Sequence, residues 1–192
     1  MQLYNADGGA AEMSGNGIRC FAQAVVDAGW RDDGAFEVAT DAGVRTVDVG
    51  ADNGSGLRNV RVSMGVAKML RDDGRVASVD TGNPHLVHLV EDFASLDILA
   101  LGAQHPDVNV EVVRVDDRAT VTMVVHERGA GLTQACGTGS CATVAATVAW
   151  GLTDASVAVH NPGGVLQVEL VDDEAFLTGP AQFVARVELP CR

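Results

Sequence analysis

Ser14-Gly15-Asn16-Gly17 and Cys136-Gly137-Thr138-Gly139 are two versions of one sequence element, and they decide the fold. Each is followed by an apolar run, Ile18 to Val26 in the first copy and Cys141 to Trp150 in the second. A Gly-rich loop that opens an apolar helix, present twice, predicts two related lobes that each offer a helix N-terminus to a shared cleft. Such a cleft could hold one carboxylate between two opposed proton-transfer groups.

The length and net charge of the chain limit the classes of protein to which it can belong. The chain has 192 residues, 47% of them hydrophobic, which is enough for one sizeable domain or two small lobes. Its formal net charge of −13 argues against binding to nucleic acid or to an anionic membrane surface. No apolar run reaches the length of a membrane span, and the N-terminus lacks the pattern of a signal peptide. We therefore expect a cytoplasmic protein whose ligand is a small molecule.

The cysteines do not match a metal site or a disulfide framework. The sequence contains no C-x-x-C spacing, so it predicts no zinc site, and reduced thiols are expected. Cys20 and Cys141 fall on apolar helix faces, where buried cysteine is common, so both are expected in the core. Cys136 is expected to have a functional role instead. A thiol is a poor helix cap, and the glycines that follow Cys136 give it little to pack against.

Apolar periodicity gives the order of the elements. It predicts helices over residues 15–28 and 137–150, with a short helix at 95–104. Alternating apolar segments bounded by Gly, Asn and Asp turns predict strands at 36–40, 44–49, 59–64, 76–80, 86–90, 108–115, 120–126, 156–160, 165–170 and 182–189. A helix as apolar as the one at 137–150 should be wrapped by a sheet, so the expected class is α+β.

The stretch from Gly137 to Ala142 also fits the G-x-G-x-x-A pattern of a dinucleotide-binding loop. That pattern should follow a strand almost directly and open a βαβ unit. Here about nine residues separate it from the strand-like segment 120–126, and no acidic residue closes a following strand. A nucleotide site is therefore not expected.

Several motifs together resemble the diaminopimelate epimerase family, and they occur in the family's order over nearly the whole chain. They are Tyr4-Asn5-Ala6-Asp7-Gly8, Ser14-Gly15-Asn16-Gly17-Ile18-Arg19-Cys20, Gly82-Asn83-Pro84-His85, Val108-Asn109-Val110, and Glu127-Arg128-Gly129 leading into Ala135-Cys136-Gly137-Thr138-Gly139. Agreement of several independent motifs is far more specific than a single match.

The resemblance implies a fold and an activity. It implies two pseudo-symmetric lobes, each a curled and mostly antiparallel sheet around a central helix, with the first lobe incomplete. We expect residues 1–64 to be the remainder of the N-terminal lobe and 65–175 the C-terminal lobe, the two joining near 65–74. Residues 176–192 are expected to return toward the first lobe as a strand. The implied activity is cofactor-independent interconversion of LL- and meso-diaminopimelate, with an amino acid as substrate and a homodimer as the assembly.

Inversion at Cα needs a base on one face and an acid on the other, because a single group would usually return the proton to the same face. A thiol suits this role, and a helix N-terminus is expected to lower its pKa. Charge that develops at Cα spreads toward the α-carboxylate. Backbone N–H groups at 15–17 and 137–139 could stabilise that charge as an oxyanion hole does.

The resemblance also implies roles for single residues. Cys136 is one acid/base, Ser14 occupies the opposite position, and Glu127 and His85 match positions that assist the proton transfers. The remaining matches hold the substrate or lie in the anion-binding loops: Asn5, Gly15, Asn16, Asn83, Asn109, Arg128, Gly137 and Thr138.

Two departures from the family pattern leave alternatives open. The family usually has cysteine where this chain has Ser14, and a hydroxyl is a weaker proton donor and acceptor than a thiol unless a neighbour activates it. The family also carries further strands before the Asn5 motif, so we expect a fragment or a mis-set start. The alternatives are a proline-racemase-like epimerase or dehydratase, and an inactive remnant that binds an amino acid.

Overall fold

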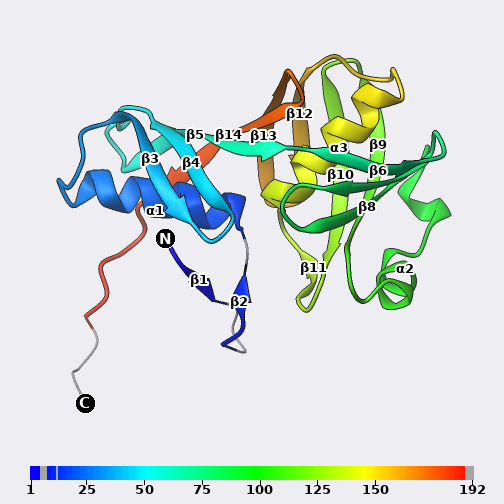
Figure 1. Cartoon of the computed structure of the whole chain (residues 1–192), viewed down its shortest axis with the longest axis horizontal. Helices are drawn as coiled ribbons and strands as arrows, with labels where there is room; N and C mark the ends of the chain where they lie inside the picture. The colour runs from blue at the N-terminus through cyan, green and yellow to red at the C-terminus, as the bar shows by residue number, and fades with distance from the viewer. Residues whose placement is uncertain (5–7, 12, 189–192) are drawn as a thin grey trace.

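The structure is a computed structural model that describes residues 1–4, 8–11 and 13–188. It is an α+β fold with two lobes, each built on one long helix (Figure 1). Helix α1 (Gly15–Asp27) lies in the first lobe and α3 (Gly137–Ala149) in the second, close to the predicted spans. Strands pack on one face of α1, whereas strands surround α3, whose residues 137–147 are all buried. Among the described residues, no helix has the length and apolarity that crossing a membrane requires.

Within the described residues, twelve strands form one mixed sheet in the order β3-β4-β5-β14-β13-β12-β10-β9-β8-β7-β6, with β11 paired to β10. Neighbours are antiparallel except β10–β12 and β8–β9, which are parallel. The strands are β3 (Gly34–Thr40), β4 (Gly43–Val49), β5 (Leu57–Val66), β6 (Lys68–Asp72), β7 (Val76–Asp80), β8 (Pro84–Leu89), β9 (Asn109–Asp117), β10 (Thr120–Glu127), β11 (Gly131–Thr133), β12 (Ser156–Asn161), β13 (Gly164–Val171) and β14 (Glu174–Gln182). A separate pair, β1 (Leu3–Tyr4) and β2 (Ala10–Ala11), leads into α1.

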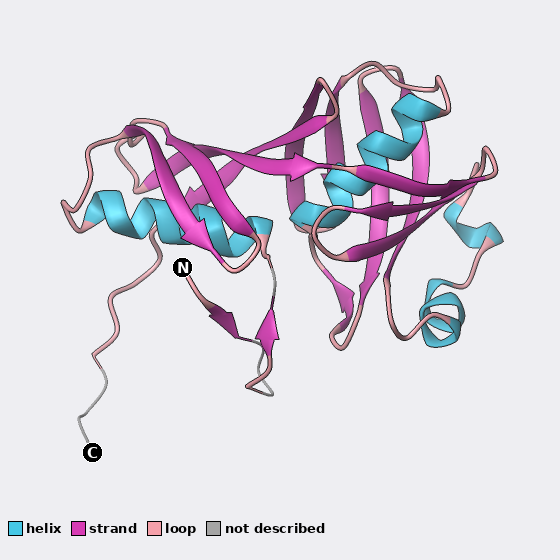
Figure 2. Ribbon diagram, in the orientation of Figure 1, coloured by secondary structure: helices cyan, strands magenta, loops and turns pink. Residues whose placement is uncertain are grey.

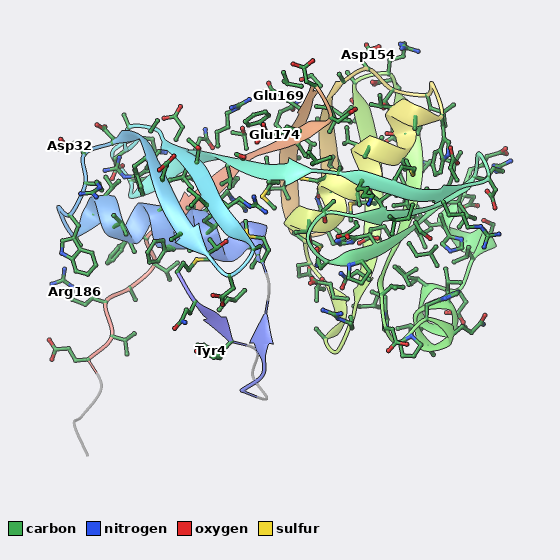
Figure 3. The ribbon with its side chains drawn as sticks, viewed as in Figure 1. Tyr4, Asp32, Asp154, Glu169, Glu174 and Arg186 are labelled. Atoms are coloured by element: carbon green, nitrogen blue, oxygen red, sulfur yellow. The ribbon has the colours of Figure 1, made fainter. Side chains whose placement is uncertain are left out.

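Strands β5 and β14 connect the two lobes, as Figure 2 shows. They pair antiparallel along their whole length, from Leu57 opposite Gln182 to Val66 opposite Glu174. The outer face of this bridge is polar. Arg61 of β5 bonds Glu169 at 3.0 Å and stacks over the Phe176 ring at 3.9 Å, and Glu169 and Glu174 both lie on the β13–β14 ribbon (Figure 3). The segment 65–74, where the lobes were expected to join, contains the end of β5 and all of β6.

Two sequence-based expectations about the elements need correction. The strand expected at 182–189 is wrong, because the last strand is β14 and residues 183–188 have no regular structure. Pairing stops at Gln182, whose partner Leu57 is the first residue of β5, and Phe183, Val184 and Val187 are exposed beyond it. The short helix expected at 95–104 is divided into a 3-10 turn at Phe93–Ser95 and α2 (Ile98–Gln104).

The core of each lobe follows the periodicity of its elements. In β5, Val60, Val62 and Met64 are fully buried, as alternation along a strand requires. Cys141 is buried in α3 as expected. The expectation that Cys20 is also buried is wrong, since Cys20 is exposed. It lies two residues after the buried Ile18, and that step of about 200° turns a side chain to the opposite face of the helix.

Candidate functional site

Ser14 and Cys136 occupy the same structural position in the two lobes, the N-cap of a central helix. Both have extended backbone, with φ −140° and ψ 116° at Ser14 and φ −122° and ψ 117° at Cys136. Ser14 Oγ accepts a hydrogen bond from the Gly17 N–H at 3.0 Å, and Cys136 Sγ accepts one from the Gly139 N–H at 3.3 Å. The repeated motif therefore folds into a repeated cap, with oxygen in one copy and sulfur in the other.

The N-termini of the two helices meet at Gly15 and Gly137. A Cβ built on Gly15 would lie 3.0 Å from Gly137 Cα, and a Cβ built on Gly137 would lie 2.9 Å from Gly15 Cα. Both would also lie within 3 Å of Leu177 Cδ2, on the connecting strand β14. Real Cβ atoms do not occur at such distances from backbone, so glycine at both positions is what allows the helix ends to approach. The positive ends of two helix dipoles thus converge on one place.

A cavity of about 260 Å³ lies at this junction, and both N-cap residues line it. Its wall contains eight of the residues singled out from the sequence: Ser14, Gly15, Asn16, Asn83, Glu127, Cys136, Gly137 and Thr138. Leu3, Tyr4, Met13 and Ala135 complete the wall. The cavity is therefore lined from both lobes, with a hydroxyl and a thiol in the same space and first-turn backbone beside each. It suits a small anionic ligand.

His85, Asn109 and Arg128 do not line the cavity. His85 is 1% exposed and lies behind Asn83, whose Oδ1 is 3.0 Å from His85 Nε2. Asn109 is also buried; its Nδ2 donates to the Pro84 carbonyl at 3.2 Å, and its Oδ1 accepts from the Arg128 N–H at 2.9 Å. Asn109 thus binds backbone on both sides. The Arg128 side chain is exposed at the end of β10, and Asn5 lies outside the described residues.

Asn16 and Glu127 are each held in place by a neighbour. Asn16 Nδ2 donates to the Ala135 carbonyl at 3.2 Å across the lobes, and its Oδ1 accepts from Arg19 Nη2 at 3.0 Å. Arg19, which is 6% exposed, also donates from Nη1 to the Gly15 carbonyl at 2.9 Å. Glu127 accepts a hydrogen bond from the Thr133 hydroxyl. Sequence reasoning missed the supporting role of Arg19, although an arginine inside an apolar helical run is a signal of a buried cation that needs partners.

Sequence reasoning also missed Glu111, the most deeply buried carboxyl of the site. Glu111 lies on β9 with its side chain 0% exposed, and its Oε1 is 2.7 Å from Nδ1 of His85. It approaches the first turn of α3 so closely that a Cβ on Gly139 would lie 2.4 Å from Oε1. The available signal was a carboxyl flanked on both sides by valines, at Val110 and Val112, since buried charged groups are almost always paired.

The electrostatics of Cys136 contradict the sequence-based expectation of a lowered thiol pKa. Burial raises the pKa of Cys136, and the nearby charges of Glu111 and Glu127 raise it further. Hydrogen bonds from Thr138 and Gly139 act in the opposite direction but do not compensate. The helix terminus alone does not decide the sign, because the thiolate would be desolvated beside two carboxyl groups. The surroundings of Cys136 therefore favour the neutral thiol over the thiolate.

The chain matches a known family over almost its whole length. The family model described as "Diaminopimelate epimerase" matches residues 1–70 and 77–184. Among curated relatives, the diaminopimelate epimerase of Desulfitobacterium hafniense is 39% identical, with 96% of this chain and 75% of that protein covered. The diaminopimelate epimerase of Mycobacterium avium is also 39% identical, with 98% of this chain and 72% of that protein covered.

Solved structures share the architecture at much lower identity. A phenazine biosynthesis protein of the PhzF family from Bacillus anthracis superposes with a TM-score of 0.73 at 12% identity, covering 96% of this chain and 80% of its own. A hydroxyproline epimerase from Agrobacterium vitis, solved with bound trans-4-hydroxy-L-proline, gives a TM-score of 0.71 at 16% identity, covering 95% and 67%. Similarity at this level supports the fold alone. With the family model and the relatives at 39% identity, it follows that the chain belongs to the diaminopimelate epimerase family.

Proposed function

We propose that this chain is a cofactor-independent amino-acid epimerase that interconverts LL- and meso-2,6-diaminopimelate by proton transfer at Cα. The observation that carries the proposal is that Ser14 and Cys136 cap two abutting helices and line one cavity. Cys136 acts on one face of Cα and Ser14 on the other. Family membership supports the choice of diaminopimelate as substrate.

The proton transfers balance without a redox partner. In one direction Ser14 first passes its hydroxyl proton to Glu127, which lines the same cavity. The Ser14 alkoxide then takes the proton as the Cα–H bond breaks, and the electron pair moves into the α-carboxylate. The neutral Cys136 thiol then delivers its proton to the opposite face, which leaves a thiolate and an inverted centre. In the other direction the thiolate removes the proton and the Ser14 hydroxyl returns one. The raised pKa of Cys136 makes the thiol the resting form.

The helix N-termini provide the site for the α-carboxylate. Charge develops on its oxygens in the transition state, and four first-turn residues of α1 and α3 line the cavity: Gly15, Asn16, Gly137 and Thr138. Preorganised N–H groups at such a site stabilise developing negative charge without rearrangement. Glu127 and His85 assist the transfers, one on the cavity wall and one behind it. Asn5, Asn83 and Arg128 hold the polar groups of the substrate, and Asn109 positions Arg128 by accepting a hydrogen bond from its backbone N–H at 2.9 Å.

We also propose how the chain is divided into lobes and how it assembles. We assign residues 1–64 to the N-terminal lobe, 65–175 to the C-terminal lobe and 176–192 to a returning segment, and we assign a homodimer as the assembly. Sedimentation of the purified chain would test the dimer, because a monomeric mass at all concentrations would exclude it.

Deuterium exchange tests the activity directly. In D2O, the chain should incorporate deuterium at Cα of diaminopimelate, and Cys136→Ala should remove that incorporation because no acid/base group then serves that face of Cα. Cys20→Ala is the matched control, since Cys20 is exposed on α1 and does not line the cavity. Binding of diaminopimelate without exchange would contradict the proposal in favour of an inactive remnant. Exchange into proline or hydroxyproline alone would favour the proline-racemase-like alternative.

A further inference from the structure

A carboxyl and an imidazole form an isolated buried pair behind the cavity. Glu111 Oε1 and His85 Nδ1 are 2.7 Å apart, and both side chains are 0% exposed. Among the described residues, Glu111 Oε2 has no hydrogen-bond partner, so His85 accounts for the polar contact of this carboxyl. A buried carboxyl destabilises a fold unless hydrogen bonds or an opposite charge compensate for its lost hydration.

A continuous path of hydrogen bonds leads from this pair to the sulfur of Cys136. His85 Nε2 lies 3.0 Å from Asn83 Oδ1, and Asn83 Nδ2 donates to Thr138 Oγ1 at 3.3 Å. Thr138 Oγ1 in turn lies 3.4 Å from Cys136 Sγ. The path crosses from β9 through β8 and the turn before it to the N-terminus of α3.

The chemistry of each group gives the path a direction. An amide oxygen only accepts hydrogen bonds, so the contact with Asn83 Oδ1 requires hydrogen on His85 Nε2. The Asn83 amide nitrogen only donates, so it uses an acceptor position of the Thr138 oxygen. The hydroxyl hydrogen of Thr138 is thereby left available for Cys136 Sγ, 3.4 Å away. Donation to sulfur favours the thiolate over the thiol.

We propose that Glu111 is a positioning residue that keeps hydrogen on His85 Nε2 and thereby, through Asn83, directs the Thr138 hydroxyl at Cys136 Sγ. The two ring contacts together require two protons on the pair, one on Nε2 and one between Nδ1 and Glu111 Oε1. Nε2 then keeps its hydrogen whether the second proton lies on the ring or on the carboxyl. Without a partner at Nδ1, the neutral ring can place its hydrogen there. Asn83 Oδ1 then loses the His85 donor and keeps the Thr81 hydroxyl, at 3.2 Å, and since a hydroxyl can also accept, the amide can turn over. The Thr138 hydroxyl would then bond Asn83 and leave the sulfur. This role rests on the proposed function of Cys136.

Two substitutions separate positioning from charge. Glu111→Gln and Glu111→Leu both remove the negative charge, but only glutamine carries an N–H that can donate to His85 Nδ1. The first readout is the 15N chemical shifts of the His85 ring, assigned by their loss in His85→Gln. The second is the rate at which iodoacetamide alkylates Cys136 at fixed pH, followed by peptide mass spectrometry. Cys20, which is exposed, is the internal reference in the same sample.

The expected results follow from the direction of the path. In the original chain and in Glu111→Gln, the ring should carry hydrogen on Nε2. In Glu111→Leu that signature should be lost, and Cys136 should react about tenfold more slowly than in Glu111→Gln, as expected for loss of one hydrogen bond to a charged group. The rate at Cys20 should not change. Thr138→Val should slow Cys136 similarly, and Thr138→Ser should not.

Three results would overturn the proposal. One is a ring of the original chain with hydrogen on Nδ1 only, which can be read even if Glu111→Leu does not fold. Another is equal alkylation rates for Cys136 in folded Glu111→Leu and Glu111→Gln. The third is an unchanged rate in Thr138→Val. None of these measurements uses a substrate, so failure of the proposed epimerase activity and failure of the Glu111 role are separate outcomes.

Discussion

The backbone of Gly15 lies against the backbone of Gly137, and this contact is the point at which the two lobes share a site. A Cβ on either residue would come within about 3 Å of the other residue's Cα. The contact brings the N-cap of α1 beside the N-cap of α3, so a hydroxyl and a thiol line the same cavity. The geometry of the site therefore depends on glycine at positions 15 and 137 as much as on the reactive side chains of Ser14 and Cys136.

Alanine at Gly15 or Gly137 should separate the helix termini. We expect loss of Cα–H exchange in either variant, with a loss of stability of about 1–3 kcal/mol, which is the usual cost of overpacking. Leu177→Ala is the matched partner, because Leu177 Cδ2 is the other atom that the new methyl group would meet. The Gly15→Ala/Leu177→Ala double variant should still lack exchange, since the backbone clash remains. Recovery of exchange in the double variant would mean that the helix contact itself is not required.

The repeated loops could be recognised from the sequence because their information is local. A small polar residue before Gly-x-Gly and an apolar run is an N-cap followed by a helix, whatever the rest of the chain does. Both helices begin where the sequence predicted, after Ser14 and Cys136, and both residues are N-caps although a thiol was expected to be a poor one. Most strand spans are also close, for the same reason: alternation is a property of neighbouring residues.

The features that sequence reasoning missed depend on tertiary contacts. Glu111 is one of several charges on β9 until β8 brings His85 beside it. The surroundings of Arg19 likewise depend on β14, where the Pro180 carbonyl accepts a hydrogen bond from Arg19 Nε at 3.4 Å. The direction of the pKa shift at Cys136 also depends on tertiary contacts. A helix N-terminus is visible in the sequence, but the depth of burial and the carboxyl groups that oppose it are not.

Stability should fall at alkaline pH because of the buried thiols. Burial raises the pKa of Cys141 to about 12 and raises that of Cys136 as well. In the unfolded chain a thiol ionises near pH 8.5, so above that pH the unfolded state holds fewer protons than the native state. Each thiol then removes up to about 1.4 kcal/mol of stability per pH unit. Denaturant melts of the original chain and of Cys141→Ala between about pH 7 and 10 would measure this.

The quantity to compare between the original chain and Cys141→Ala is the slope of stability against pH, not the stability at one pH. Cys141→Ala leaves a small cavity and should be less stable than the original chain near neutral pH. Its stability should nevertheless decline less steeply above about pH 8.5, because one ionising thiol is gone from the unfolded state. Parallel slopes for the two proteins would contradict a raised thiol pKa at Cys141.

Gly139→Ala should displace Glu111. The new methyl carbon would lie 2.4 Å from Glu111 Oε1 and 3.1 Å from its Cδ, and the side chain is fully buried, so it has little room to move. We expect the variant to lose stability and Cα–H exchange together. In the Gly139→Ala/Glu111→Ala double variant the clash is absent, so its loss of stability should be smaller than the sum of the two single losses. Additive losses in a double-mutant cycle would show that the methyl group is accommodated elsewhere.

Ser14 should limit turnover, and its two roles can be separated. Ser14→Ala removes both the helix cap and the proposed proton carrier, with a stability cost of about 1 kcal/mol. Ser14→Gly removes the proton carrier at a cost of only a few tenths of a kcal/mol, because glycine is an acceptable N-cap. Both should abolish inversion of diaminopimelate, followed by chiral chromatography, while Ser14→Cys should raise the rate because a thiol ionises more readily than a hydroxyl. If Ser14→Gly retained inversion, the oxygen at this position would be a cap alone and the second base would have to come from another residue on the cavity wall.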